Sequence, residues 1–473
     1  MNRDPFVVVG GDAAGLSAAS KFRREQPDRD VVVFEQGQWV SYAHCGLPYF
    51  IEGTVDRLTD LLSLSPTDVA ERGIDLRRGH EVVSVSPTER TVTVRSEGER
   101  FDQPYSELLV ATGARATTRS FDATLDGVFT VHGLDSAAAI DAYLAAPGEY
   151  DRNRLGDGPV DRGRVDHNAA LAPPERAAIV GGGYVGVEMA EALVARGLDV
   201  HLFQRSSHLL PPFGEAVAER VAAHLGERGV AVHTDTPVER LVGDGRIEAI
   251  AFDDDRLSVE MAVLGVGIEP NAGLLDGTGV DRGPNGALHV DDYGRTSLPA
   301  IYAAGDVATS RHTVMGRSTW MPLGLTANRA GRAVGATVAG DPTPVGDVAG
   351  TAVVKAFDLE CGRVGLVDGD EATDAGFDPV RETITAESRS GYYPGAADTT
   401  VTLVADRGSR RVLGGTIVGS DRAAIRIDTL ATALDANLRV DELERLDLAY
   451  APPFSPVWDP ILVAAKVLNG RLA

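Results

Sequence analysis

Two cysteines, Cys45 and Cys361, are the residues of this chain best suited to redox chemistry. A single cysteine cannot store electrons as an internal disulfide. Its thiolate can, however, form a mixed disulfide with a small thiol, or it can be oxidised to a sulfenic acid. Both reactions require a thiol pKa that is lowered by nearby positive charge or by a helix N-terminus. The Gly-Leu-Pro sequence that follows Cys45 predicts such a helix start.

A buried structural cysteine is the simpler interpretation of an isolated thiol. We predict that role for Cys361, which lies in no recognisable motif. The neighbours of Cys45, from Ser41 to Tyr49, do form a motif, and they favour a redox role there. Two cysteines in 473 residues provide neither a disulfide framework nor a set of zinc ligands, so no metal site is expected.

The second group of residues with a clear chemistry is a glycine pattern, Gly181, Gly183 and Gly186. It lies between a strand-like run at 177–180 and a helical stretch at 185–196. In this setting the first glycine permits a tight turn, the second lets a pyrophosphate approach, and the third lets the helix pack on the strand. The pattern therefore predicts a dinucleotide site.

The end of the following strand bears on which nicotinamide cofactor binds there. An acidic residue that would hold a ribose 2′-hydroxyl is missing, and Gln204, Arg205 and Ser206 stand in its place. Arginine and serine suit a 2′-phosphate, which favours NADPH over NADH. The alternative is that Arg205 is a solvated surface residue.

A similar unit opens the chain, with a strand-like run at 6–9 and a helical stretch at 13–24. Its turn contains Gly10, Gly11, Ala14 and Gly15, but Asp12 occupies the slot of the middle glycine. Glu35 ends the next strand and can accept hydrogen bonds from ribose hydroxyls. This unit supports a second dinucleotide site less strongly than the first pattern does.

Two later segments strengthen that site. A strand-like run from 109 ends in Thr112 and Gly113, and another delivers Asp306 at its carboxyl end. Ligands of open α/β sheets bind outside the carboxyl ends of strands. Asp306 is therefore placed to bind a ribityl hydroxyl or a nearby phosphate.

The wider pattern is that of an α/β protein with several domains. The two βαβ units lie about 170 residues apart. Residues 147–173 are polar, lack apolar periodicity, and are expected to form a surface loop or insertion. From about residue 344, strand-like runs at 351–357, 400–404 and 412–418 and a helical stretch at 422–435 predict a separate α+β domain.

The composition excludes some partners. The formal net charge is −24, from 45 basic and 69 acidic residues, and only Lys21, Lys355 and Lys466 are lysines. Such an acidic surface argues against nucleic acid or an anionic membrane as a partner, and high salt would screen its self-repulsion. The composition resembles that of halophile proteins, although an ordinary acidic protein is the alternative. No apolar run is long enough to span a membrane, and no signal peptide is evident, so we expect a cytoplasmic protein.

In this order the motifs resemble the pyridine nucleotide–disulfide oxidoreductases, and the resemblance covers essentially the whole chain. It implies two Rossmann-like dinucleotide-binding domains, for FAD and NAD(P)H, and a C-terminal α+β dimerisation domain that forms a homodimer. The domain ranges that follow from it are an FAD-binding domain at 1–146 and 271–343, the polar insertion at 147–173, an NAD(P)H-binding domain at 174–270 and the dimerisation domain at 344–473.

Within this family, the lone Cys45 resembles the single-cysteine branch. Two runs, 391–395 and 450–455, are similar to tyrosine segments of coenzyme A-disulfide reductases. The resemblance implies that Tyr392, Tyr393 and Tyr450 reach the cysteine of the partner subunit. A phenol, with a pKa near 10, suits hydrogen bonding to a thiolate better than full proton transfer.

The resemblance also implies substrate contacts and a reaction. Arg24 is the basic candidate for the phosphates of coenzyme A, and His44 is a second substrate contact. The expected reaction is reduction of a small disulfide, with coenzyme A disulfide as the leading substrate. An NAD(P)H oxidase that reduces O2 through a Cys45 sulfenate and a persulfide or polysulfide reductase are the alternatives. A flavin-bound sensor whose third domain binds a protein partner is a further one.

Overall fold

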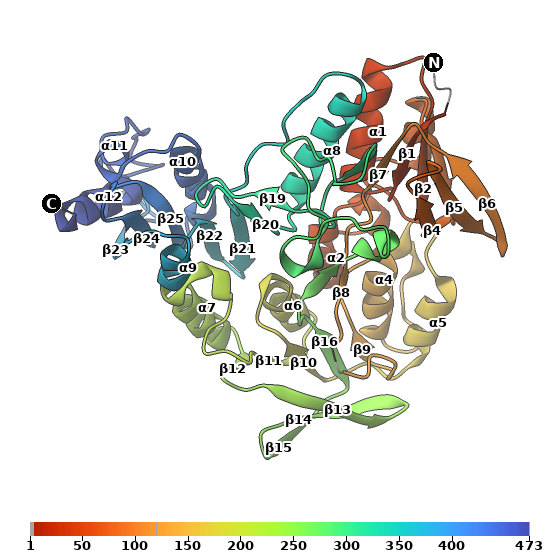
Figure 1. The fold of residues 1–473 in the computed structure, drawn as a ribbon. Coiled ribbons are helices and arrows are strands. Elements are labelled where there is room, and N and C mark those ends of the chain that lie inside the picture. The colour runs from red at the N-terminus through yellow and green to blue at the C-terminus, as the bar shows by residue number, and fades with distance from the viewer. Residues whose placement is uncertain (1–3, 120, 473) are drawn as a thin grey trace.

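The computed structural model describes residues 4–119 and 121–472, which form three domains, each built on a sheet (Figure 1). The first sheet has the order β18-β7-β1-β2-β3, and all its neighbouring strands are parallel. Its central strand β1 is the buried run Phe6–Val9. The helices α1 and α8 lie side by side on one face (Figure 1), and the small sheet β4-β5-β6 covers the other.

The elements of this first domain come from two separate parts of the chain. They are β1 (Phe6–Val9), α1 (Ala13–Glu25), β2 (Val31–Glu35), α2 (Leu47–Glu52), α3 (Pro66–Glu71), β3 (Asp75–Arg78), β4 (Glu81–Ser86), β5 (Thr91–Ser96), β6 (Glu99–Pro104), β7 (Glu107–Val110), β8 (Ala114–Ala116), β18 (Ile301–Ala303), β19 (Ser310–Arg311), β20 (Ser318–Thr319) and α8 (Gly324–Val338).

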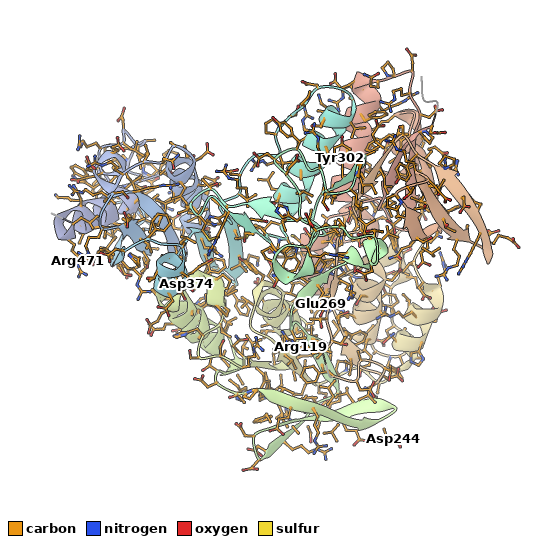
Figure 2. All side chains as sticks on the ribbon, viewed as in Figure 1. Arg119, Asp244, Glu269, Tyr302, Asp374 and Arg471 are labelled. Carbon is orange, nitrogen blue, oxygen red and sulfur yellow. The ribbon has the colours of Figure 1, made fainter. Side chains whose placement is uncertain are left out.

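The second domain repeats the parallel arrangement, with the strand order β12-β11-β10-β16-β9. Its elements are β9 (Val128–Phe129), α4 (Leu134–Tyr143), α5 (Arg162–Ala170), β10 (Arg176–Val180), α6 (Tyr184–Ala195), β11 (Asp199–Phe203), α7 (Glu215–Glu227), β12 (Val230–His233), β13 (Val238–Asp244), β14 (Arg246–Phe252), β15 (Asp255–Ser258), β16 (Met261–Leu264) and β17 (Ile268–Pro270). The hairpin strands β13–β15 form a separate small sheet, and Asp244 lies at one of its ends (Figure 2).

The first two domains are joined by two antiparallel strands, β8 and β17. Arg115 of β8 and Glu269 of β17 form a salt bridge of 2.9 Å, and Figure 2 labels Glu269 in this junction. The chain thus leaves the first domain and returns to it through one narrow connection. This explains why the first domain is discontinuous in sequence, as the sequence predicted.

The third domain is an antiparallel sheet in the order β21-β22-β25-β24-β23. Its elements are β21 (Ala352–Ala356), β22 (Leu359–Gly365), α9 (Gly369–Asp374), β23 (Pro379–Glu387), β24 (Asp398–Asp406), β25 (Val412–Gly419), α10 (Ala423–Asp435), α11 (Val440–Leu443) and α12 (Pro460–Arg471). Helices α10 and α12 pack on the sheet, and α7 of the second domain also contacts it. Together the three domains confirm the expected α/β fold class.

The predicted boundary at residue 146 differs from the structure. Strand β9 pairs with β16 of the second sheet, with Val128 beside Ala262 and Phe129 beside Val263. The buried residues of α4 join the core of the same domain. A two-residue strand is too short to be identified from the sequence, so the second domain begins earlier than predicted.

The expectation of a surface loop over 147–173 is wrong. The segment contains a 3-10 turn at Arg152–Leu155 and the helix α5, which packs on α4. Val165 is buried, and Arg154 forms a 2.8 Å salt bridge with the fully buried Asp141 of α4. The helix could not be predicted from the sequence because α5 buries only two residues, too few to produce an apolar periodicity.

No helix among residues 4–119 and 121–472 combines the length and apolarity needed to span a membrane.

Candidate functional site

The predicted residues of the first dinucleotide unit meet at the carboxyl edge of the first sheet. Strands β7 and β18 are paired in parallel. Thr112 follows the end of β7 and Asp306 follows the end of β18, so the two residues lie at neighbouring strand ends. Next to Asp306, a Cβ added to Gly305 would lie 3.0 Å from the Cβ of Ala14. The sheet thus brings the glycine turn, Thr112 and Asp306 together, as the sequence predicted.

The Thr112–Gly113 turn is held by a distant residue. The hydroxyl of Thr112 donates to the carbonyl of Asn271, and the side-chain amide of Asn271 donates back to the carbonyl of Thr112, at 2.8 and 2.9 Å. Asn271 follows β17, the returning strand of the junction. Sequence analysis did not identify Asn271, because nothing local links it to Thr112.

The two glycine turns have the same internal geometry. A Cβ on Gly15 would lie 1.9 Å from the carbonyl oxygen of Gly10, and a Cβ on Gly186 would lie 1.9 Å from that of Gly181. No side chain fits at this distance, so glycine is required for helix and turn to approach. Each turn is therefore built as the fingerprint predicts.

Gly183 differs from these glycines because a Cβ there would meet nothing within 4 Å. It is the N-cap of α6 and gives that helix no side-chain cap. The backbone donors of the first turn thus remain available for an anion. The protein leaves the space around Gly183 empty although its own packing does not require glycine there. This space suits a pyrophosphate bound at the turn.

Glu35 and Gln204 occupy equivalent places in the two domains. Glu35 Oε2 accepts a hydrogen bond from the amide of Gly11, and Gln204 Oε1 accepts one from the amide of Gly182, both at 2.9 Å. Burial raises the pKa of Glu35, although backbone hydrogen bonds act against it. Gln204 keeps the structural contact but lacks the charge, and the exposed Arg205 follows it.

Cys45 lies in the 3-10 turn His44–Gly46, directly before α2. The side chain reaches solvent, whereas Cys361 is fully buried in β22 with its thiol pKa raised to about 12 by burial. The structural role predicted for Cys361 agrees with this burial. Among the described residues, both thiols are free and form no disulfide.

The thiol pKa of Cys45 differs from the expectation of a lowered value. The surrounding protein raises it by desolvation, and the carboxylates Glu188 and Asp306 raise it further. The predicted helix start is present, but α2 is only six residues long. The chain's own charges therefore favour the neutral thiol over the thiolate.

Glu188 and Tyr49 are functional candidates that sequence analysis missed. Tyr49 of α2 donates a hydrogen bond of 3.2 Å to Glu188 Oε1 of α6, 139 residues away in sequence. Burial raises the pKa of Glu188 to about 7, with the charge of Glu191 adding to the effect. The spacing of Glu188, two residues after the last fingerprint glycine, was the only local signal.

Both ring nitrogens of His44, the predicted substrate contact, lie against atoms of the protein. Its Nε2 is 2.5 Å from Asp12 Oδ2, and its Nδ1 is 3.2 Å from the carbonyl oxygen of His132. Asp12, which departs from the glycine fingerprint, and His44 are thus in direct contact.

Arg24 is exposed near the end of α1, the helix whose first turn adjoins the Cys45 segment. Eleven residues of helix separate it from Ala13, a rise of about 17 Å. Arg72, which follows α3, hydrogen-bonds Ser20 on the same helix. Only a long substrate could contact both Cys45 and these guanidinium groups.

The predicted tyrosines lie on the third domain. Tyr392, Tyr393 and Tyr450 are 77%, 37% and 48% exposed. Within the described chain, no hydrogen bond or ring contact connects any of them to Cys45. The third domain does reach α2 through Lys355 of β21, whose Nζ lies 5.4 Å from the ring centroid of Tyr49, but this contact involves none of the three tyrosines.

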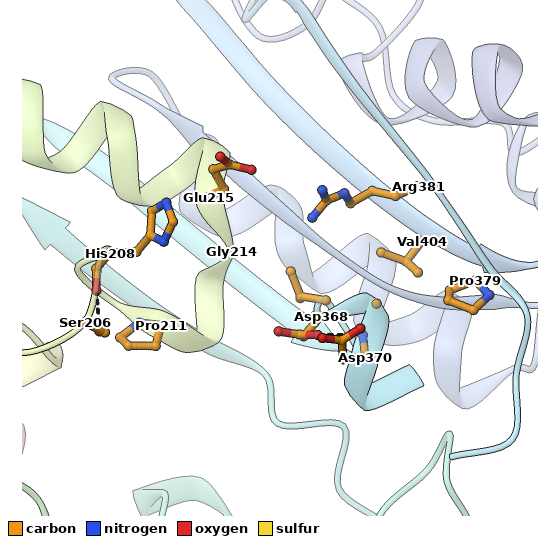
Figure 3. A pocket seen from close by; sticks show the side chains of 12 residues that line it. Ser206, His208, Pro211, Gly214, Glu215, Asp368, Asp370, Pro379, Arg381 and Val404 are labelled. Carbon is orange, nitrogen blue, oxygen red and sulfur yellow. Dashed lines mark hydrogen bonds between the residues drawn. The ribbon is translucent and has the colours of Figure 1, made fainter. Parts of the chain in front are cut away.

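A cavity of about 530 Å³ lies elsewhere, between the second and third domains (Figure 3). Figure 3 shows Glu215 and His208 on one side and Arg381, Asp368 and Asp370 on the other. Ser206, which the sequence analysis considered for a 2′-phosphate, lines it, but Cys45 and the fingerprint glycines do not. We therefore assign the chemistry to the carboxyl edge of the first sheet.

Comparison with known proteins agrees with this geometry. Residues 4–331 match the pyridine nucleotide-disulphide oxidoreductase family, and residues 351–460 match the dimerisation domain of that family. The chain belongs to the pyridine nucleotide-disulphide oxidoreductases. As a member, it is a flavoprotein oxidoreductase that works with NAD(P)H.

Similar proteins have related names. The chain is 36% identical over 98% of both lengths to an NAD(P)H coenzyme A polysulfide/persulfide reductase of Pyrococcus horikoshii. It is 30% identical to a coenzyme A disulfide reductase of Staphylococcus aureus, covering 95% of this chain and 96% of that protein. The crystal structure of reduced Bacillus anthracis CoADR-RHD superposes with a TM-score of 0.90 at 29% identity, covering all of this chain and 81% of that one.

Proposed function

We propose that this protein uses NAD(P)H to reduce a small-molecule disulfide or persulfide at Cys45, with coenzyme A disulfide as the leading substrate. The observation that carries the proposal is the position of Cys45. Of the two thiols in the described chain, it is the exposed one, and it lies directly before α2, beside the carboxyl edge of the sheet of the first domain. Two relatives named for coenzyme A chemistry support the substrate class.

The protein chemistry begins with the Cys45 thiolate attacking one sulfur of the substrate disulfide. A Cys45–substrate disulfide forms, the substrate S–S bond breaks, and the second thiol leaves with the electron pair. A flavin bound at the first sheet would supply the two-electron redox chemistry that links NAD(P)H to the Cys45–substrate disulfide. The balance is one NAD(P)H and one proton consumed for two thiols released.

Residues of the first two domains would hold the cofactors. In the first unit they are Gly10, Gly11, Ala14, Gly15, Glu35, Thr112, Gly113 and Asp306. In the second they are Gly181, Gly183, Gly186 and Arg205. The uncharged Gln204 and the exposed Arg205 support NADPH over NADH, because a 2′-phosphate would find a cation and no competing carboxylate.

The raised thiol pKa of Cys45 indicates that further groups must favour the thiolate during the reaction. We propose that hydroxyl groups of Tyr450, Tyr392 and Tyr393, supplied by a second copy of the chain, donate hydrogen bonds to it. Their exposure and the match to a dimerisation domain support a homodimer. Arg24 is a candidate for the substrate phosphates, at a distance that suits a long thiol.

The test is anaerobic NADPH oxidation by the purified holoenzyme, with and without coenzyme A disulfide. We expect turnover that requires the disulfide, is lost in Cys45→Ser and persists in the control variant Cys361→Ser. Both variants should keep the flavin. Turnover that persists in Cys45→Ser contradicts the mechanism. Oxidation that begins only when air is admitted would assign an NAD(P)H oxidase instead.

A further inference from the structure

Asp12 stands at the N-cap of α1, yet its side chain makes no capping hydrogen bond to that helix. Aspartate at this position usually accepts a bond from a backbone amide of the first turn. Here Oδ1 accepts from the amide of Tyr42 at 3.2 Å, and Oδ2 lies 2.5 Å from Nε2 of His44. Asp12 thus contacts both Tyr42 and His44, the residues that immediately precede Cys45 together with Ala43.

The two ring nitrogens of His44 both face acceptors. Nε2 faces the carboxylate of Asp12, and Nδ1 lies 3.2 Å from the backbone carbonyl oxygen of His132. A carbonyl oxygen cannot donate, and a neutral imidazole carries only one N–H. Both bonds form together only when His44 is protonated, so it is not available as a base for Cys45.

The surroundings of His44 favour this charge. Asp12 and Asp306 are the carboxylates that act on it, and Tyr42 stacks on its ring at 4.2 Å between ring centroids. His132 is the other nearby imidazole; burial lowers its pKa, and its Nε2 contacts a backbone carbonyl. Burial alone would lower the pKa of His44, but the bond and charge of Asp12 raise it above the ordinary value.

We propose that Asp12 and His44 are positioning residues for Cys45, which hold the cysteine turn more tightly against the first dinucleotide turn while His44 is protonated. The proposal rests on the redox role of Cys45 proposed above. Backbone hydrogen bonds of the same segment, from Ala43 to Leu61 and from Gly46 to Ala43, would loosen with the pair. The contribution of the pair is complete below the ordinary histidine pKa of about 6.5, and it is lost as the pH rises through the raised value.

The experiment is amide hydrogen exchange of the holoenzyme, with protection measured for the segment 41–47 from pH 6 to pH 9 after correction for intrinsic rates. In the wild type, we expect protection to fall about tenfold as His44 loses its proton, the equivalent of one charge-assisted hydrogen bond. At every pH, the variants His44→Asn and Asp12→Asn should have the low protection of segment 41–47 that the wild type has at high pH.

His167→Asn is the matched control, because His167 forms a similar 2.8 Å contact with Asp126 on the second domain. It should keep the wild-type profile, and strand β10 should stay protected in every variant, which excludes general unfolding. Protection of 41–47 that does not depend on pH, or that His44→Asn leaves unchanged, would overturn the proposal.

A parallel measurement separates this proposal from the function on which it rests. Iodoacetamide should alkylate Cys45 in the wild-type holoenzyme, while the buried Cys361 stays unmodified. An unreactive Cys45 would contradict the proposed reaction, whatever the exchange profile. A reactive Cys45 with a flat exchange profile would reject only the positioning role.

Discussion

Glu188 and Tyr49 place a carboxylate and a phenol close to the thiol on which the chemistry depends. The carboxylate of Glu188 is a leading electrostatic cause of the raised Cys45 pKa, and its own pKa of about 7 lies within the working range. Interacting groups of this kind titrate as a pair. The ionisation of Glu188 should therefore influence both folding stability and thiol reactivity.

The first prediction concerns Glu188→Gln. Because the pKa of Glu188 is raised on folding, the native state binds more protons than the unfolded state between about pH 4.5 and 7, and stability falls as the pH rises. Glutamine removes this loss, so the stability of the variant minus that of the wild type should increase from pH 5 to pH 8. Denaturant unfolding midpoints of both proteins at the two pH values measure this difference.

Glu71→Gln, at an exposed carboxylate on α3, is the control for this prediction. It should follow the pH dependence of the wild type. If Glu188→Gln also does so, the carboxylate is not held in a destabilising environment. A lower thiol pKa of Cys45 in Glu188→Gln, measured by alkylation, would support the coupling of the two groups.

The two strand–turn–helix elements share one geometry, and among the glycine slots of the fingerprint they differ in one, occupied by Gly183 in one element and Asp12 in the other. In the second domain, nothing in the chain lies near a Cβ at that slot, so only a ligand would make glycine necessary. In the first domain, the same slot carries a side chain that reaches the cysteine turn. We therefore propose that this local structure binds a cofactor in both domains and, in the first domain, also positions the cysteine turn.

The second prediction is that Gly183→Ala weakens NADPH binding without affecting folding. The added methyl group should crowd the pyrophosphate and raise the Kd roughly tenfold, while the thermal midpoint and flavin content stay unchanged. Calorimetric titration measures the Kd. Gly226→Ala is the control, because Gly226 of α7 also has open space around its Cβ. An unchanged Kd in Gly183→Ala would contradict the assigned pyrophosphate site.

The third prediction tests whether α5 is a folded element. Val165→Ala should destabilise the protein by roughly 2 kcal/mol, since two buried methyl groups are lost and a cavity remains. The exposed neighbour Arg164→Ala should change stability little. Equal free energies of unfolding for the two variants, measured with denaturant, would favour the original interpretation of 147–173 as a loop.

At the scale of the molecule, the site is divided between domains and, we propose, between subunits. The exposed tyrosines lie on the third domain, together with other exposed apolar side chains, Phe454, Val457 and Trp458. An exposed apolar patch of this kind is typical of an interaction surface. A second copy of the chain is the partner that the matching dimerisation domain supports.

The fourth prediction is complementation between inactive subunits. Cys45→Ser and Tyr450→Phe should each lower disulfide reduction severely as homodimers. After the two are mixed and subunits exchange, heterodimers regain one complete site, with Cys45 from one chain and Tyr450 from the other. Activity should then rise above that of either parent. Mixing with the double variant, which cannot complement, is the control, and no gain would place cysteine and tyrosine in the same chain or in no common site.

The fifth prediction follows from the net charge of −24. Mobile cations screen repulsion between surface carboxylates, so raising KCl from 0.1 to 2 M should increase the thermal midpoint by roughly 5 °C. Sorbitol at equal osmolality is the control, because this uncharged osmolyte is excluded from the protein surface but does not screen charge. A midpoint that rises equally in sorbitol, or not at all in KCl, would argue against adaptation to high salt.

The sequence by itself determined the local features of this protein. Buried strand runs such as Phe6–Val9 and glycine turns such as Gly181–Gly186 are governed by neighbouring residues, so their structure and cofactor class could be predicted. The carboxyl-edge rule for parallel strands also placed Thr112 and Asp306 together without knowledge of contacts. The role of Cys45 came from a motif of nine residues.

Only the tertiary structure decided which distant side chains share an electrostatic environment. Asp12 and His44 are 32 residues apart, and Tyr49 and Glu188 are 139 apart, so no local pattern connects them. The assignment of β9 to the second sheet and the folding of α5 depend likewise on partners elsewhere in the chain. Charge and burial act through space, and for that reason the raised thiol pKa of Cys45 could not be inferred from its neighbours in sequence.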